Sequence, residues 1–155
     1  MSTSTGAISA RLARVLAGED PELLARMPSG YAILGKHQPP AIRGCCMLLP
    51  DPVVASPNEL DPAQRAQFFS DLVLLGDAIL QATGAERINY LVLCNQVPEL
   101  HGHCIPRFGS EDPGLRMQGP FEAYDFGAAP IASAAGAEME LHRAIQRELE
   151  ALLAA

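Results

Sequence analysis

The densest group of chemically active side chains lies between Asn95 and Arg107, a segment that reads Asn-Gln-Val-Pro-Glu-Leu-His-Gly-His-Cys-Ile-Pro-Arg. Glu99, His101 and His103 occupy every second position, so two of the four histidines of the chain fall in one short stretch. Side chains two residues apart on a β-strand share one face of the sheet. A carboxylate and two imidazoles are therefore expected to project together, as a phosphate-handling site or as a metal site.

Covalent chemistry on phosphate is the first interpretation of this group. An imidazole is a good nucleophile at neutral pH and a good leaving group from phosphorus. A second imidazole, Arg107 and backbone amides of the preceding loop would hold the phosphate oxygens as their charge redistributes. This interpretation makes the two histidines the reacting and supporting groups.

A metal centre is the second interpretation. Glu99, His101 and His103 form a two-histidine, one-carboxylate set of the kind that binds iron or zinc. Ligands on alternate positions of one straight strand rarely surround a cation, so a further ligand such as His37 or Cys45 would be needed. No spacing in the sequence indicates that ligand, and the residues alone leave both interpretations open.

The motif resembles the signature of the histidine triad (HIT) family of nucleotide hydrolases and transferases. That signature is His-x-His-x-His followed by two apolar residues, often with Pro-Arg next. In the bacterial branch similar to diadenosine-polyphosphate hydrolases, Gly-Asn-x-Val-Pro commonly precedes it, and this chain has Cys94-Asn-Gln-Val-Pro98. The resemblance covers roughly residues 31–107.

The resemblance implies a role for each matching residue. His101 takes the place of the central histidine, the nucleophile that attacks the α-phosphate and forms a nucleotidyl-histidine. His103 takes the place of the third histidine, which orients the phosphate. Asn95 and Gln96 fall in the phosphate-contacting loop, and Asn89 is a further candidate for a ribose or phosphate contact.

The chain departs from the family at the first histidine of the triad, where it has Glu99. The resemblance gives this position an assisting role. A carboxylate there is expected to place negative charge beside the phosphate unless it turns away or pairs with Arg107, Arg43 or Lys36.

The activity implied by the resemblance is cleavage of a nucleoside phosphoanhydride or phosphoramidate by hydrolysis or transfer. No metal is required for the covalent step, although Mg²⁺ suits a polyphosphate substrate. The family's usual state is a homodimer. Two alternatives remain: a nucleotide-binding module with little or no turnover, and a metal-binding protein that uses Glu99, His101 and His103.

The elements that must position the motif indicate an α+β fold. We expect a HIT-like antiparallel sheet with a long helix between strands and flanking N- and C-terminal helices. Asp61 as N-cap, Gln64 in the capping-box position and Gly84 as stop define the long helix at 62–83. The other predicted elements are helices at 7–27 (with a break near 18–21) and 138–153, and strands at 31–34, 45–49, 87–94 and 100–108.

Length and composition favour one domain spanning residues 1–155, with its core at about 28–108 and flanking segments on both sides. A net charge of -7 argues against binding polymeric nucleic acid. No apolar run approaches the roughly 20 residues that span a bilayer. The cysteines have no CxxC spacing, and with no signal-peptide pattern at the N-terminus the cytoplasm is the expected location.

Overall fold

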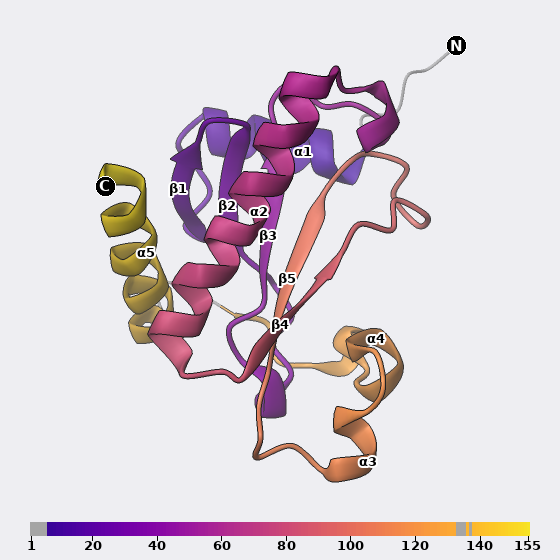
Figure 1. Ribbon diagram of the computed structural model, residues 1–155, viewed down its shortest axis with the longest axis vertical. Helices are drawn as coiled ribbons and strands as arrows, with labels where there is room; N and C mark the ends of the chain where they lie inside the picture. Colours follow the sequence, from indigo (N-terminus) through magenta and orange to yellow (C-terminus); the bar gives the residue numbers. More distant parts are fainter. Residues whose placement is uncertain (1–5, 133–135, 137) are drawn as a thin grey trace.

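The computed structural model describes residues 6–132, 136 and 138–155. Its centre is a five-stranded antiparallel sheet in the order β1-β2-β3-β5-β4 (Figure 1), which confirms the predicted HIT-like architecture. The strands are β1 Leu23–Met27, β2 Gly30–Leu34, β3 Cys46–Pro50, β4 Arg87–Leu91 and β5 Gly102–Arg107.

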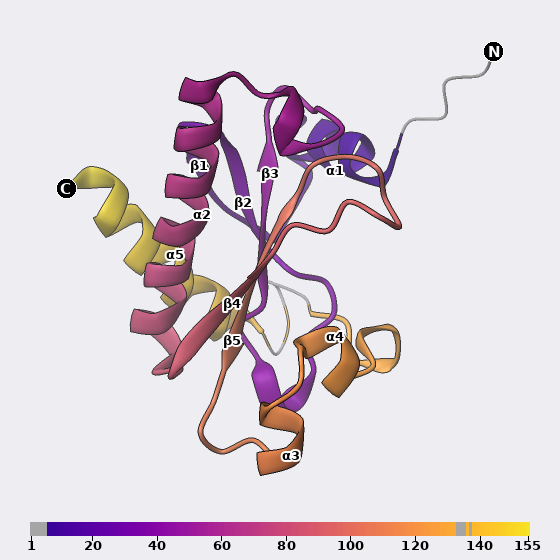
Figure 2. The ribbon, with the colours of Figure 1, turned by 45° about the vertical axis from the view of Figure 1, so that its right-hand side comes forward.

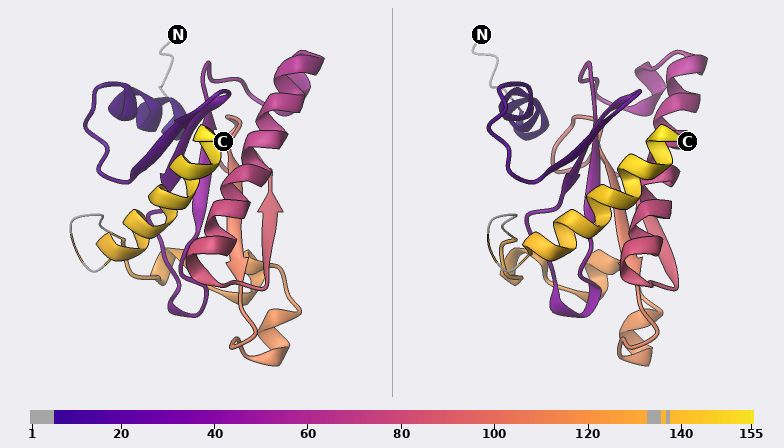
Figure 3. Two further views of the ribbon diagram at one scale, coloured as in Figure 1. Left: turned by 60° about the vertical axis from the view of Figure 1, so that its left-hand side comes forward. Right: turned by 90° about the vertical axis from the view of Figure 1, so that its left-hand side faces the viewer.

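Helices lie on both sides of this sheet. They are α1 Ala7–Leu16, α2 Pro62–Thr83, α3 Pro113–Arg116, α4 Pro120–Ala123 and α5 Met139–Ala154, with short 3₁₀ turns at Pro40–Ile42, Pro57–Glu59 and Phe126–Ala128. Figure 2 shows α2 and α5 on one side of the sheet and α1 and α4 on the other. In Figure 3, α5 runs diagonally across the strands beside α2. Among the described helices, none has both the length and the apolar character needed to cross a membrane.

The long helix α2 begins and ends where its capping residues predict. The Asp61 carboxylate accepts from the Gln64 backbone N–H (2.8 Å), and the Gln64 side chain accepts from the Asp61 N–H (3.1 Å). Gly84 ends the helix in the left-handed conformation with φ 72°, which glycine adopts without the steric cost of a Cβ. The buried stripe that packs on the sheet comprises Phe68, Leu72, Leu75 and Ile79.

The segment 23–27 corrects the predicted N-terminal helix, because it forms strand β1 instead. Leucine, alanine, arginine and methionine all favour helices locally. Here the segment pairs with β2 in a hairpin and buries Leu24 and Met27, and this tertiary packing outweighs the local preference. Only 7–16 of the predicted helix is helical, as α1.

The hydrophobic core includes residues on both sides of the segment 28–108. The sheet already begins at Leu23, and Ile145 and Leu149 of α5 are fully buried in the main core. The C-terminal helix is therefore a part of the core, rather than a flanking addition. His142 of α5 is also buried, and its Nε2 lies 2.8 Å from the Leu23 carbonyl oxygen.

Alternate residues of β5 face opposite sides of the sheet. Gly102 faces α2, since a Cβ on it would lie 2.6 Å from Leu72 Cδ1. Cys104 faces the same way, with its thiol donating to the Leu72 carbonyl oxygen (3.2 Å). His101 and His103 therefore face the side away from α2.

We expect Gly102→Ala to destabilise the protein by about 1–3 kcal/mol, because the added methyl overpacks the contact with Leu72. Urea unfolding of the variant measures this change. Gly119→Ala is the control, because nothing lies within 4 Å of a Cβ there, and its effect should stay within about 0.5 kcal/mol. Equal stabilities of the two variants would contradict the close approach of α2 to β5.

Candidate active site

A pocket of about 670 Å³ lies on the side of the sheet away from α2. It is lined by His101 and His103, by the loop 93–97 that precedes them, and by residues 121–122 and 124–127 that follow the motif. The structure thus brings together four of the residues singled out in the sequence: His101, His103, Asn95 and Gln96.

His101 is held in one orientation by the backbone. Its Nδ1 lies 2.7 Å from the carbonyl oxygen of Glu99. A carbonyl oxygen only accepts hydrogen bonds, so Nδ1 carries the proton and Nε2 keeps its lone pair in the neutral ring. The residue is 8% exposed and lines the pocket. A buried, oriented imidazole with a free nitrogen is the form in which histidine acts as a nucleophile.

His103 is a neutral partner at physiological pH. Burial, and to a smaller extent the neighbouring His101, lowers its pKa to about 4. Its ring centroid lies 5.0 Å from that of His101 and 5.2 Å from that of Phe121, edge-on in both cases. It therefore meets a ligand as a hydrogen-bonding imidazole, without a fixed positive charge.

The low pKa of His103 predicts a loss of stability in acid. The folded pKa of about 4 lies below the unperturbed 6.5, so the unfolded state binds more protons between these pH values. The neutral His103 therefore contributes fully to the free energy of unfolding above pH 6.5. This contribution, at most about 3 kcal/mol, is lost as the pH falls toward 4.

The measurement is the free energy of unfolding of wild type and His103→Asn between pH 7 and pH 4. We expect the wild type to lose more stability than the variant over this interval. Parallel pH dependences would mean that His103 is not held neutral by the fold.

The loop before the motif is shaped by an unusual backbone conformation. Cys94 has a φ of 54°, in the left-handed region that residues other than glycine rarely adopt. Asn95 and Gln96 follow directly, are exposed and line the pocket. Such conformations persist where the surrounding structure holds them, often at functional sites.

Arg107 and Asn89 lie away from the pocket. Arg107 is 3% exposed, and all its N–H groups are engaged within the protein. The guanidinium donates to the Glu111 carboxylate (3.0–3.2 Å), to Asn89 Oδ1 (2.8 Å), and to the carbonyl oxygens of Leu115 (3.0 Å) and Gln118 (2.7 Å). Neither side chain therefore lines the histidine pocket, where a phosphate contact was expected. Both side chains belong to an internal network.

This network fixes the wall of the pocket that follows the motif. Burial alone raises the pKa of Glu111, but hydrogen bonds from Arg107 and Tyr124 outweigh it and hold the pKa below its usual value. Burial and the bond to Glu111 raise the pKa of Tyr124 to about 12. Glu111 is thus an anion that ties β5 to Tyr124 (2.7 Å) and, through Tyr124, to the wall at 121–127.

The Glu99 side chain also turns out of the pocket. Its carboxylate accepts from the backbone N–H groups of Ile8 (3.2 Å) and Ser9 (3.4 Å) and from the Ser9 hydroxyl, all at the start of α1. Arg107 pairs with Glu111, and Arg43 pairs with Glu138. The expected negative charge beside the phosphate is therefore absent from the pocket, and within the described residues Glu99 makes no ion pair.

The same orientation bears on the metal interpretation. With its carboxylate at α1, Glu99 does not join His101 and His103 on a shared face. Across residues 6–132, 136 and 138–155, no group of three or more His, Cys, Asp or Glu side chains is placed to hold a metal ion.

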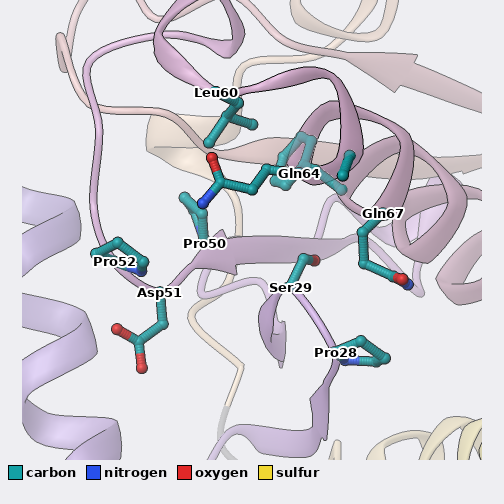
Figure 4. Close-up of a pocket in the computed structure, with 10 residues that line it drawn as sticks. Pro28, Ser29, Pro50, Asp51, Pro52, Leu60, Gln64 and Gln67 are labelled. Atoms are coloured by element: carbon teal, nitrogen blue, oxygen red, sulfur yellow. The ribbon is translucent and has the colours of Figure 1, made fainter.

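A second hollow, of about 280 Å³, lies against the first turns of α2 (Figure 4). Its walls come from the β1–β2 turn, from the end of β3 and from α2, and they include Pro28, Pro50, Pro52, Gln64 and Gln67. No imidazole or thiol lines it. The histidine pocket, unlike this hollow, is lined by imidazoles.

Sequence reasoning did not identify Glu111, Phe121 or the contact between Glu99 and α1. Glu111 follows Arg107 by four residues. This short separation of opposite charges is the only feature of the sequence that could have suggested the ion pair. Glu99 and Ser9 are 90 residues apart, and no local pattern connects them.

The fold and the site define the class: this chain has the fold of the histidine triad proteins. It superposes on a histidine triad protein from Sinorhizobium meliloti with a TM-score of 0.67 and 26% identity, covering 98% of this chain and 100% of that one. A hypothetical histidine triad nucleotide-binding protein from Sulfolobus tokodaii gives a TM-score of 0.69 at 17% identity, with 92% and 93% covered. A histidine triad protein from Bradyrhizobium japonicum gives 0.66 at 21% identity, with 86% and 94% covered.

No protein-family model and no curated protein matches the chain. The resemblance in fold extends over nearly the whole length of the chain.

Proposed function

We propose that this protein is a HIT-type enzyme that hydrolyses or transfers a nucleotidyl group, with His101 as the nucleophile. The observation that carries the proposal is the 2.7 Å contact between His101 Nδ1 and the Glu99 carbonyl oxygen. It leaves Nε2 unprotonated in a pocket that also contains His103. The solved structures with this fold are histidine triad proteins, and one of them is described as nucleotide-binding.

The proposed reaction has two displacements at phosphorus. His101 Nε2 attacks the α-phosphorus, the N–P bond forms, and the bond from phosphorus to the leaving group breaks with its electron pair on the leaving group. Water then attacks the same phosphorus, and the N–P bond breaks to release a nucleoside monophosphate and the free imidazole. Covalent catalysis of this kind replaces one difficult step with two easier ones.

The remaining pocket groups support binding. Asn95, Gln96 and the amides of their loop are placed to hydrogen-bond phosphate oxygens, and a bound phosphate would raise the pKa of His103. Phe121 and Phe126, with ring centroids 4.8 Å apart, offer aromatic surface to a base. Such contacts suit a nucleotide as the small-molecule partner.

The negative charge of the pocket favours binding of Mg²⁺ together with a polyphosphate substrate. Glu122 and Asp125 line the pocket, and no lysine or arginine does so within the described residues. A polyphosphate would bring several negative charges beside these carboxylates, and Mg²⁺ would neutralise them. A phosphoramidate of a nucleoside monophosphate has no such requirement, and the covalent step itself uses no metal.

The test is a substrate panel: adenylyl and guanylyl phosphoramidates and dinucleoside polyphosphates, each with and without Mg²⁺. Release of nucleoside monophosphate from at least one substrate, under multiple-turnover conditions, is the expected result. Binding of nucleoside monophosphate without turnover of any substrate would favour the binding-module alternative. The absence of a first triad histidine from the pocket is the observation that favours this second candidate.

We also propose a homodimer, based on the free edge of the sheet at β4. Phe69 and Val73 of α2 are 43% and 48% exposed, and Tyr90 of β4 is 41% exposed. Helical spacing places Phe69 and Val73 on the same stripe as Gly76, which contacts the Tyr90 hydroxyl. An apolar strip thus borders β4, the edge strand of the described sheet. Light scattering should give twice the 16.5 kDa chain mass, and Val73→Lys should shift the mass toward the monomer.

The proposed location is the cytoplasm. Cys45, Cys46, Cys94 and Cys104 are all free thiols, as is usual in reducing compartments.

A further inference from the structure

Helix α1 begins without a cap of its own. Its N-cap residue, Gly6, offers no side-chain acceptor, and the first turn has no acidic residue. The first N–H groups of a helix have no partner within the helix, and its positive end favours an anion. Glu99 supplies both the acceptor and the charge, through the bonds to Ile8, Ser9 and the Ser9 hydroxyl.

The space around this contact is closely fitted to the carboxylate. A Cβ at Gly6 would collide with the Glu99 carboxylate, so a glycine is required where the carboxylate meets the chain. Helix α1 is itself fixed on the histidine side of the sheet, where Ile8 and Val15 pack with Ile33 and Leu49. The start of α1, where the Glu99 side chain is bound, is therefore packed against the sheet.

The backbone of the same residue holds the proposed nucleophile. The Glu99 carbonyl oxygen is the acceptor for His101 Nδ1 at 2.7 Å. Glu99 thus links α1 to His101. Its side chain binds the start of α1, and its carbonyl oxygen sets the tautomer and the orientation of the His101 ring. The next peptide N–H, that of Leu100, donates to the Val54 carbonyl oxygen (2.7 Å), so the peptide plane has one further restraint.

We propose that Glu99 is a positioning residue for His101. Its side chain, bound at the N-terminus of α1, fixes the carbonyl that keeps the His101 ring in the Nδ1-protonated tautomer with Nε2 free toward the pocket. The residue at the first position of the motif then orients His101, and its carboxylate does not contact the substrate. The effect of Glu99 on kcat rests on the proposed function, whereas its effect on the tautomer and the orientation of the His101 ring does not.

The test is the ¹⁵N NMR spectrum of the histidine ring nitrogens in wild type, Glu99→Ala, Glu99→Gln and Asp61→Ala. The wild-type His101 should show a protonated Nδ1 and an unprotonated Nε2. In Glu99→Ala we expect a mixture of tautomers, or averaged ring signals, at His101. Glu99→Gln keeps an acceptor oxygen for the α1 N–H groups and should retain the wild-type pattern.

Asp61→Ala is the matched control, because the Asp61 carboxylate also accepts from a backbone N–H at the start of a helix, that of Gln64 in α2 (2.8 Å), at an exposed position. Its His101 signals should be unchanged. Ser9→Ala provides a milder variant that removes only the hydroxyl contact, and it keeps the test available if Glu99→Ala does not fold. Wild-type His101 signals in both Glu99→Ala and Ser9→Ala would overturn the proposal and leave the Leu100–Val54 bond as the sufficient restraint.

If the protein turns over a substrate, Glu99→Ala should lower kcat by about tenfold with KM changed less than about twofold, because orientation of the nucleophile is lost while binding groups remain. A change confined to KM would overturn the positioning role. If no substrate is turned over, the NMR result still decides the proposal, so failure of the proposed function is distinguishable from failure of this inference.

Discussion

Replacing His101 by alanine is expected to lower kcat by at least about a thousandfold, because the variant has no nucleophile to form the nucleotidyl intermediate. The pocket keeps Asn95, Gln96 and His103, so binding of a nucleoside monophosphate should change far less than turnover. Steady-state kinetics with a substrate found in the panel, together with calorimetric titration of the monophosphate, measure the two effects separately.

His142→Ala is the control for this experiment. It also removes a buried imidazole, but one on α5 that contacts the carbonyl oxygen of Leu23 in β1 and does not line the pocket. It should leave kcat unchanged at a temperature where the variant is folded. Comparable losses of kcat in His101→Ala and Glu99→Ala would contradict the assignment, because a positioning residue cannot matter as much as the reacting group.

The largest expected effect on stability comes from Arg107→Ala. Arg107 and Glu111 have side chains 4% and 0% exposed, so the substitution leaves a buried carboxylate with no cation beside it. Breaking a buried pair in this way typically costs about 3–5 kcal/mol. Urea unfolding, followed by far-ultraviolet circular dichroism, measures this loss.

The exposed pair Arg43–Glu138 provides the comparison, since the Arg43 side chain is 46% exposed. Arg43→Ala should cost less than about 1 kcal/mol. The double variant Arg107→Ala/Glu111→Ala should cost clearly less than the sum of its single variants, because the second change removes the uncompensated charge. Additive losses would mean that the two side chains do not act as a pair.

Local signals in the sequence predicted the long helix and the strand that carries the two histidines. The capping box of Asp61 and Gln64 and the stop at Gly84 identify α2 because each acts within a few residues of the helix end. The period of two places His101 and His103 on one side of β5 for the same reason, since alternation is a property of a single strand.

The features that the sequence did not predict depend on contacts between distant segments. Residues 23–27 form a strand because β2 pairs with them, against their own helix preference. Glu99 was interpreted as a charge in the pocket because its alternation with the histidines was visible, whereas its partner at α1 was not. Arg107 likewise has the chemistry of a phosphate ligand, and only the fold shows that Glu111, Asn89 and two carbonyl groups occupy it.

The central claim is that a nucleotidyl group becomes bonded to His101, and trapping that adduct tests it most directly. The enzyme is mixed with a substrate labelled at the α-phosphorus, denatured within milliseconds at alkaline pH, where phosphorus–histidine bonds survive, and digested for mass spectrometry. We expect the mass of a nucleoside monophosphoryl group on the peptide that contains His101, and its absence in His101→Ala. Turnover with no adduct on this residue, or an adduct on His103 instead, would contradict the account.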